Sequence, residues 1–501
     1  MQEVLNGFAI GFGAVLNIRI LLLLILGGAI GTLTGAMPGL GPSSSIALLL
    51  PMAISMSNAQ EGLALLVSVY LGCMFGGRIT AITLNIPGDA PAIVTAWDGY
   101  PMMRQGRGGV AMSISALTSA FGGLVSFLLL AAFAPALAKV ALNFSAPENF
   151  SIMLFGFAMV VGLAEKKVLK SLISLSLGIL IAMIGADQIT GLGRYVFTME
   201  LYEGIEFTIV VLGAYGIGEV LSTVEEASKI DFAGKELKLN RMFPTWKEIK
   251  SCIGSAIRGT TIGTLIGMLP GAGGTIATFL TYSVEKSVSK NPDEFGKGCI
   301  QGVAAPEAAN NASVGGAMVP MLALGIPGSG TTAMLLGALT MFGLQAGPRI
   351  FTTSTEVVWT MIVGLIVANI FLFIVNTLLI PLFIKGIQIG QEYLSPIICV
   401  ICCIGVFAIT YGTWHIRLVI LFGLLGYLFK KFGYPTGPFI LALVLAKMCE
   451  VSFRQALIMG RGNYSIFITR PISMVFILLT VFSLFLPLIR KRIKALKQEK
   501  K

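Results

Sequence analysis

Long apolar stretches separated by short polar ones recur along the whole chain of 501 residues. Stretches such as 18–37 and 110–141 are long enough to cross the ~30 Å hydrocarbon core of a bilayer as helices. The shorter stretch 43–57 contains Pro51 and suits a half-helix or re-entrant segment. The other candidate spans lie at about 61–77, 149–164, 168–186, 206–222, 252–269, 312–325, 330–347, 356–384, 394–411, 415–429, 435–450 and 471–489. The pattern therefore predicts an all-α polytopic membrane protein with about ten to twelve crossings.

Two of the apolar stretches end in the same interruption. The segment Ile30-Gly-Thr-Leu-Thr-Gly-Ala-Met-Pro-Gly39 matches Ile262-Gly-Thr-Leu-Ile-Gly-Met-Leu-Pro-Gly271 at seven of ten positions, 232 residues later. A second pair follows in the same order, Asn85-Ile-Pro-Gly-Asp89 and Gly325-Ile-Pro-Gly-Ser329, 240 residues apart. Two motifs in the same order with nearly the same offset indicate an internal duplication, that is, two homologous halves.

Each interruption breaks a helix at a place where small and polar residues follow. Proline removes an N–H group and clashes with the preceding turn, and glycine permits backbone angles that other residues avoid. In a bilayer, broken backbone persists only where it is buried in protein or lines an aqueous cavity. We therefore predict that Pro38-Gly39 and Pro270-Gly271 face each other across one cavity near mid-membrane, and that both Ile-Pro-Gly segments close on it. The alternative is that each Pro-Gly marks a loop at the membrane edge.

The polar stretches divide the chain into two halves, a linker and a tail. We expect transmembrane halves at 1–223 and 252–489, joined by the polar linker 224–251, which holds six basic and five acidic residues. The tail 490–501 has seven basic residues against one acidic residue, so it is predicted to be cytoplasmic. If the linker is cytoplasmic too, the second half has an even number of crossings, whereas inverted repeats need an odd number. Inverted and parallel repeats both stay open.

Composition excludes several classes of protein. With 55% hydrophobic residues, 12% charged residues and a mean hydropathy of +0.87, the chain is too apolar for a soluble globule. The net charge of +11 does not indicate nucleic-acid binding, because the tail alone supplies +6. The single histidine, His415, cannot build a zinc site or a histidine-based catalytic site, and the seven cysteines are scattered in apolar runs. No phosphate-binding loop occurs, which argues against nucleotide-driven transport. We expect no enzymatic activity.

Four ionisable residues lie in or beside apolar stretches: Arg78, Asp89, Asp98 and Glu307. Each would cost at least ~2.5–3.5 kcal/mol at membrane depth, so each is expected to have a partner or a function. Arg78 is predicted to contact the substrate or replace a cation, with pairing to a nearby acid as the alternative. For Asp98 and Glu307 a position at a cavity mouth or in an interfacial loop is an equally good interpretation.

The polar residues around the breaks suit ion binding. Neutral oxygens and the carbonyls freed by broken helices fit a hard cation such as sodium, and exposed helix N-termini offer N–H groups to carboxylates. The alternative is that small polar residues connect helices. The candidate substrate- or ion-binding residues are Pro38, Gly39, Leu40, Gly41, Ser43, Ser44, Arg78, Asn85, Pro87, Gly88, Asp89, Pro270, Gly271, Gly273, Thr275, Glu307, Asn310, Asn311, Pro327, Gly328, Ser329 and Thr331.

Several of these strings resemble one known family along essentially the whole chain. They are Gly35-Ala-Met-Pro-Gly-Leu-Gly-Pro42, Phe75-Gly-Gly77, Leu84-Asn-Ile-Pro-Gly-Asp-Ala90, Asp98-Gly-Tyr-Pro101, Ala305-Pro-Glu-Ala-Ala-Asn-Asn311 and Leu324-Gly-Ile-Pro-Gly328. The sequence is similar to the large membrane subunit (TctA-type permease) of bacterial tripartite tricarboxylate transporters. The resemblance departs at Arg78, where many relatives carry a small polar residue, and this difference bears on which carboxylate is carried.

The resemblance implies secondary uptake of carboxylates such as citrate across the bacterial inner membrane, usually with sodium as the coupling ion and no other cofactor. It also implies a small membrane subunit and a periplasmic substrate-binding protein as partners. Two other functions stay open on the residues alone: a passive channel or exporter for organic anions, and, less well supported, an intramembrane enzyme. A channel needs a continuous pore, and a hydrolase needs a nucleophile–base pair or metal ligands.

Overall fold

The computed structural model describes residues 2–37, 39–56, 58–162, 167–227, 243–378, 396, 398–407, 410 and 412–484. In these ranges the chain is almost entirely helical. Six helices are long and apolar enough to cross a membrane, and seven shorter apolar helices accompany them. The expected all-α polytopic membrane protein is therefore confirmed, whereas the number of crossings stays a prediction. Pro38, most of the linker (228–242) and the basic tail lie outside the described residues.

The first half contains α1 to α10. The helices in chain order are α1 (Gln2–Val15), α2 (Ile18–Gly35), α3 (Pro42–Ile54), α4 (Ala59–Leu84), α5 (Ala92–Arg104), α6 (Gly108–Ala141), α7 (Ala146–Gly162) and α8 (Val168–Ala182). After the strands β1 (Gly185–Ala186) and β2 (Gly193–Arg194) come the 3-10 turn η2 (Met199–Leu201), α9 (Phe207–Val211), the π-helical turn η3 (Leu212–Ile217) and α10 (Gly218–Ala227).

The second half begins with a capped helix. Thr245 and Glu248 form a capping box, which satisfies free N–H groups at the start of α11 (Trp246–Gly267). The elements that follow are α12 (Gly273–Val288), η4 (Pro292–Glu294), α13 (Ile300–Leu324), α14 (Gly330–Met341), α15 (Ile350–Thr353), α16 (Thr355–Leu378), α18 (Thr413–Lys431), α19 (Thr436–Met459) and α20 (Ile466–Thr469). Unlabelled apolar helices lie at Ile398–Phe407 and Pro471–Leu484.

The order of elements around the motifs is the same in both halves. A long helix ends at the Pro-Gly break, a short helix follows, a second long helix ends at the Ile-Pro-Gly segment, and another short helix begins there. These series are α2, α3, α4, α5 in the first half and α11, α12, α13, α14 in the second. The internal duplication itself stays a prediction. Two expected boundaries are wrong: α4 continues through Arg78 to Leu84, and α13 runs unbroken through Pro306 and Pro320.

The core is built around α4 and α13, whose residues are nearly all buried. Helix α2 packs on α4, and α11 packs on α13, through glycines that bring the backbones close together. A Cβ atom on Gly35 would lie 2.4 Å from the carbonyl oxygen of Cys73, and one on Gly267 would lie 2.5 Å from that of Ser313. Close packing of small residues is a common basis of helix association in membranes.

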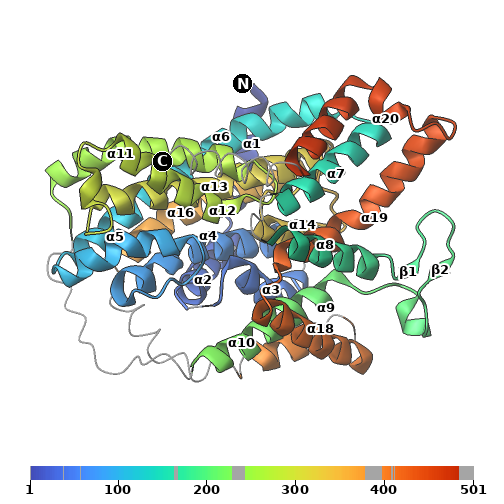
Figure 1. Cartoon of the computed structure of the whole chain (residues 1–501), viewed down its shortest axis with the longest axis horizontal. Coiled ribbons are helices and arrows are strands. Elements are labelled where there is room, and N and C mark those ends of the chain that lie inside the picture. The colour runs from blue at the N-terminus through green and yellow to red at the C-terminus, as the bar shows by residue number, and fades with distance from the viewer. Residues whose placement is uncertain are drawn as a thin grey trace, which may run out of the picture.

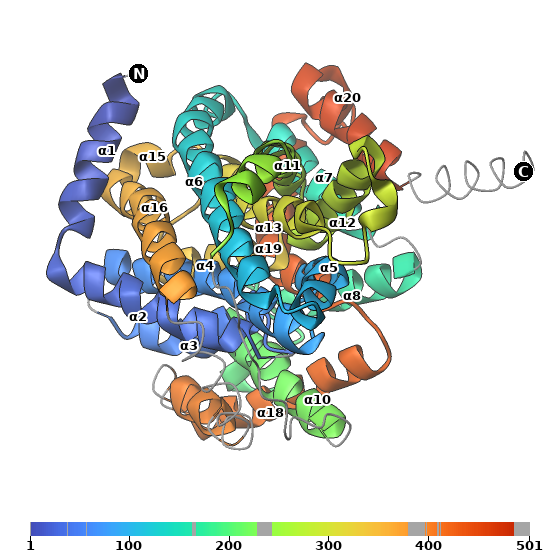
Figure 2. The same ribbon diagram turned by 90° about the vertical axis from the view of Figure 1, so that its left-hand side faces the viewer.

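The two halves are interlocked rather than placed side by side. Helix α6 of the first half packs against α13 of the second, and α16 of the second packs against α4 of the first. Figure 2 shows α1 beside α16 at one edge of the molecule and α10 beside α18 at another. Figure 1 shows the connection that carries β1 and β2 projecting from one side of the helical body.

Candidate functional site

Four short helices begin at one cavity, which we call the shared cavity. Its volume is about 720 Å³. Residues in the first turns of α3, α5, α12 and α14 line it, and these helices come from both halves of the chain. Each helix N-terminus carries the positive end of a helix dipole, roughly half a unit of charge, together with N–H groups that have no partner inside the helix. The shared cavity is therefore suited to an anion.

The N-termini of α3 and α12 follow the two Pro-Gly breaks and are uncapped. Gly39 and Gly271 adopt φ angles of 94° and 78°, a left-handed backbone that glycine accepts readily. No side chain caps either helix, so their first N–H groups stay available to a ligand. Both breaks line the shared cavity at Gly39 and Gly271, as expected from the sequence, although Pro38 lies outside the described residues.

The N-termini of α5 and α14 follow the two Ile-Pro-Gly segments and are capped by side chains. Asp89 Oδ1 accepts a hydrogen bond from the Ala92 N–H at 3.0 Å, and Ser329 Oγ accepts one from the Thr332 N–H at 3.2 Å. The preceding helices α4 and α13 end in left-handed residues, Asn85 and Gly325. Both segments therefore reach the shared cavity with the geometry of tight, preorganised turns.

Glycines fix these turns against the neighbouring helices. A Cβ atom on Gly88 would lie 2.1 Å from the carbonyl oxygen of Gly35, and one on Gly328 would lie 2.5 Å from that of Gly267. The Gly271 N–H also donates to the Gly328 carbonyl at 3.0 Å, which ties one break to the other motif of its half. A side chain at Gly88 or Gly328 is thus excluded unless backbone moves.

Most of the predicted site residues meet at the shared cavity. Those that line it are Gly39, Gly41, Ser43, Ser44, Pro87, Gly88, Asp89, Gly271, Gly273, Thr275, Ser329 and Thr331. The hydroxyls of Ser43 and Thr331 lie 3.1 Å apart and connect α3 to α14. Pro327 instead lines an adjoining cavity of about 250 Å³, which shares Gly271 and Ser329 with the first.

Several predicted residues lie elsewhere. Leu40, Pro270 and Gly328 are buried beside the breaks, and Asn85 is exposed where α4 ends. Asn310 and Asn311 are buried in α13, where the Asn311 amide donates to the Glu307 carbonyl at 3.3 Å. None of these residues lines the shared cavity.

Arg78 and Glu307 form a buried pair away from the shared cavity. Arg78 Nη1 lies 3.9 Å from Glu307 Oε2, and both side chains are almost fully buried. Ser119 bridges the pair, because it accepts from Arg78 at 3.2 Å and donates to Glu307 Oε2 at 3.0 Å. Thr95 donates to the other carboxylate oxygen at 2.5 Å. Arg78 thus pairs with an acid, which is the alternative given for it, and its contact with a substrate stays a prediction.

Asp98 also has a structural position rather than one at a cavity mouth. Its Oδ1 accepts hydrogen bonds from the N–H groups of Gly296, Gly298 and Cys299 at 2.9, 2.9 and 2.8 Å. The Tyr282 hydroxyl donates to Oδ2 at 2.9 Å. Asp98 therefore fixes the loop that precedes α13, and joins α5 to the second half.

Among the residues of the shared cavity that sequence reasoning did not find, five have polar side chains: Tyr70, Tyr215, Glu219, Lys430 and Thr436. Lys430 of α18 supplies a full positive charge, and its Nζ lies 2.5 Å from Glu219 Oε1 of α10. No local motif marks this pair. In the sequence, Lys430 follows an apolar run, as basic residues at membrane edges commonly do.

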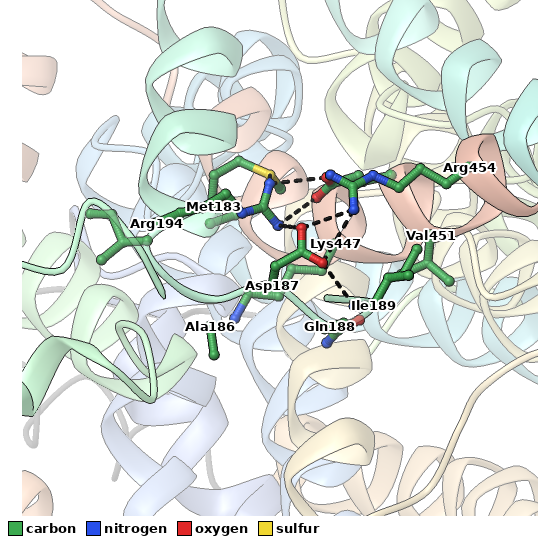
Figure 3. Close-up of a pocket in the computed structure, with 12 residues that line it drawn as sticks. Met183, Ala186, Asp187, Gln188, Ile189, Arg194, Lys447, Val451 and Arg454 are labelled. Atoms are coloured by element: carbon green, nitrogen blue, oxygen red, sulfur yellow. Dashed lines mark hydrogen bonds and ion pairs between the residues drawn. The ribbon is translucent and has the colours of Figure 1, made fainter. Parts of the chain in front are cut away.

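A second polar cluster joins the β1–β2 connection to α19. Figure 3 shows Arg194 and Arg454 turned toward the Asp187 carboxylate. Each guanidinium lies 2.9 Å from Asp187 Oδ2, and both arginines also pair with Glu450. The Thr190 and Ile189 N–H groups donate to Oδ1 and, with Arg454, hold the pKa of Asp187 well below its usual value. Its charges are mutually satisfied and only about 10 Å³ of space remains, so the cluster acts as a clamp.

The fold and the shared cavity define a helical membrane protein whose broken helices meet around a site suited to anions. The chain belongs to the tripartite tricarboxylate transporter TctA family, whose model matches residues 21–441. The resemblance seen in the sequence is thereby confirmed. Members of this family are the large subunits of tripartite transporters, and the chain is accordingly a multi-pass membrane protein of a transporter family.

Two relatives from Agrobacterium vitis are similar to the chain. One, described as "Uncharacterized 52.8 kDa protein in TAR-I ttuC' 3'region", is 37% identical over 477 residues, which cover 94% of each chain. The other, described as "Uncharacterized protein in TAR-II ttuC' 3'region", is 39% identical over 211 residues, covering 42% of this chain and 87% of the relative. No solved structure matches the chain.

Proposed function

We propose that the chain is the permease subunit for sodium-coupled uptake of carboxylates, such as citrate and other tricarboxylates, across the bacterial inner membrane. The observation that carries this proposal is the convergence of four helix N-termini on the shared cavity, two of them uncapped. A carboxylate that leaves water must exchange its hydration for N–H groups, hydroxyls or cations, since unpaired buried charge is very costly. Uncapped N–H groups supply that replacement without a conformational cost at the moment of binding.

The size and composition of the shared cavity also fit a small organic anion. Its volume of about 720 Å³ falls within the ~300–1,000 Å³ typical of small-molecule sites. The hydroxyls of Ser43, Ser44 and Thr331 and the Lys430 ammonium add hydrogen-bond donors around the helix ends. The three carboxylates of citrate could thus be shared among donors from both halves.

Membership of the family supports two partners. A small membrane subunit would complete the permease, and a periplasmic substrate-binding protein would deliver the carboxylate. The basic tail 490–501 would lie in the cytoplasm by the positive-inside rule. Sodium, as the coupling ion, would offset the charge of a multivalent substrate. No other cofactor is needed, because transport makes and breaks no covalent bond.

The test is uptake of labelled citrate into proteoliposomes that contain the chain, its small membrane subunit and the binding protein. We expect saturable accumulation driven by an inward sodium gradient, and much less with potassium in its place. A passive channel would instead equilibrate citrate without accumulation and without a response to the gradient. An exporter would accumulate citrate only under the reversed gradient. Either outcome would replace the proposal.

A further inference from the structure

Among the described residues, three charged side chains line the shared cavity: Asp89, Glu219 and Lys430. Lys430 is paired with Glu219, so those two charges offset each other. Asp89 has no lysine or arginine within 4 Å among the described residues. The neighbouring cation on α4, Arg78, is turned to Glu307 instead. With Asp89 ionised, the cavity wall therefore carries a formal charge of −1, which opposes entry of an anion.

The Asp89 side chain is only 9% exposed, and its two oxygens differ. Oδ1 caps α5 through the Ala92 N–H at 3.0 Å, whereas Oδ2 is buried without any hydrogen-bond partner. A glycine makes room for this carboxylate, because a Cβ atom on Gly77 would lie 2.6 Å from Oδ1. Asp89 therefore lies at the cavity wall with one carboxylate oxygen hydrogen-bonded to the start of α5 and the other without a hydrogen-bond partner.

A buried, unpaired carboxylate is strongly unfavourable and acquires a cation or a proton. Neutral hydroxyl oxygens line the same cavity, among them those of Tyr70, Ser329 and Thr331. A carboxylate with neutral hydroxyl and carbonyl oxygens is the ligand set that hard cations prefer. At the corresponding place in the second half, after the other Ile-Pro-Gly segment, the chain has the neutral Ser329.

We propose that Asp89 is the carboxylate that binds the coupling sodium ion, through Oδ2, and that this ion removes the negative charge that would otherwise repel the substrate. The site is single, because Ser329 gives the second half no matching charge. Sodium and carboxylate then bind with positive coupling, since each lowers the electrostatic cost of the other. This inference rests on the proposed function for sodium as the coupling ion and for the identity of the anion.

The experiment uses the full chain with its small membrane subunit, purified in detergent, and compares wild type with Asp89→Asn. Asparagine keeps an oxygen to cap α5 but removes the charge. The first readout is the thermal unfolding midpoint in sodium chloride and in potassium chloride at equal ionic strength, without substrate. Sodium should raise the midpoint of wild type and leave that of Asp89→Asn unchanged. Glu61→Gln is the matched control, because Glu61 is a largely buried acid at the start of α4, the helix that precedes the Asp89 segment, and it is paired with Arg19. This variant should respond as wild type does.

The second readout is labelled citrate binding to the same samples. Sodium should tighten binding to wild type by about tenfold, a typical size for coupling between two sites. In Asp89→Asn the affinity should be the same in sodium and potassium. The sodium-induced unfolding shift needs no citrate, so failure of citrate binding with an intact shift would count against the proposed substrate and not against the sodium site.

A third measurement covers the case in which Asp89→Asn does not fold. In wild type, acidification should weaken the sodium-induced shift, because a proton and sodium compete for Asp89 Oδ2. The other ionisable groups that line the cavity are Tyr70, Tyr215, Glu219 and Lys430, and the buried Cys73 and Glu307 also interact electrostatically with Asp89. A sodium response that persists in Asp89→Asn, a sodium response independent of pH, or a wild type that responds to protons alone would each overturn the proposal.

Discussion

At the scale of single residues, Lys430 and Glu219 place a paired positive and negative charge in the wall of the shared cavity, where the substrate would bind. Their ion pair lies in a wall of the shared cavity, with the Lys430 side chain 36% exposed and that of Glu219 12% exposed. A partly exposed pair of this kind contributes little to stability, so its position matters more than its strength. A substrate carboxylate can replace Glu219 beside the Lys430 ammonium. Glu219 therefore competes with the substrate for this ammonium.

We predict opposite effects for the two members of this pair. Lys430→Met should weaken citrate affinity by about three- to tenfold, and Glu219→Gln should strengthen it, because the ammonium is then released for the substrate. Lys430→Arg, which keeps the charge, should stay close to wild type. Equilibrium binding of labelled citrate measures all three. Equal losses in Lys430→Met and Glu219→Gln would show that the pair only connects α10 to α18.

The glycines of the two Ile-Pro-Gly segments give a second prediction. Gly88→Val and Gly328→Val should abolish transport, because the added atoms would overlap the carbonyls of Gly35 and Gly267 and push the segments out of place. Overpacking of this kind typically costs about 1–3 kcal/mol, so the variants should still reach the membrane with a lowered unfolding midpoint. Gly13→Val in α1 is the control, since no atom lies within 4 Å of its added Cβ. Normal uptake by both cavity variants would contradict the role of these turns.

The sequence predicted residues of the shared cavity wherever a local rule applied. Pro-Gly after an apolar run breaks a helix whatever its surroundings, and the small polar followers of each break do line the cavity. The sequence could not decide whether Arg78 contacts a substrate or pairs with an acid, because Glu307 and the bridging Ser119 come from distant parts of the chain. Nor could it find Lys430, whose partner Glu219 lies 211 residues away. Pairings of this separation depend on tertiary packing, which no local pattern encodes.

At the scale of elements, the long helices end beside the shared cavity and the short helices begin at it. Long helices α4 and α13 terminate in left-handed residues, which turn the chain back toward the cavity. Short helices begin there and point their N-termini inward. The sequence predicted these breaks. It also predicted a helix boundary within 300–324, but α13 continues through both of its prolines. Its small residues pack closely on α6 and α11 there.

The clamp around Asp187 gives a prediction at this scale. Asp187→Asn should release the β1–β2 connection from α19, because two arginines and two N–H groups lose their charged acceptor. Hydrogen exchange of residues 185–194 should quicken by about tenfold or more, because hydrogen bonds to a charged acceptor are stronger than those to a neutral one. Glu203→Gln, an exposed acid of the same connection, should change nothing.

The same clamp should be sensitive to acid. The folded pKa of Asp187 is depressed, so its contribution to stability is complete above the usual value of 3.8 and is lost as pH falls through the lower folded value. Exchange protection of the connection should therefore persist from neutral pH down to about pH 4 and fall below that. Protection lost already at mildly acidic pH would mean that another group controls the connection.

At the scale of the whole molecule, the interlocking of halves restricts how access to the shared cavity can change. Because α6 packs on α13 and α16 packs on α4, the long helices of the two halves cannot separate as rigid bodies without breaking the core. The rest of the cavity wall consists of the starts of the short helices and of the outer helices α10, α18 and α19, and we expect these to be the parts that move. Alternating access in this fold is thus expected to move short helices against a fixed core.

The contact between α3 and α14 offers a direct test of that expectation. The Ser43 and Thr331 hydroxyls lie 3.1 Å apart across the cavity wall, close enough for cysteines at both places to form a disulfide after minor adjustment. Oxidation of Ser43→Cys/Thr331→Cys should stop citrate uptake, because the helices that must move apart are then joined, and reduction should restore it. Each single-cysteine variant controls for the seven native cysteines, which are free. Full uptake by the oxidised double variant, with the cross-link confirmed by mass spectrometry, would show that α3 and α14 move together and that access changes elsewhere, most directly at α18, which carries Lys430 against the same cavity.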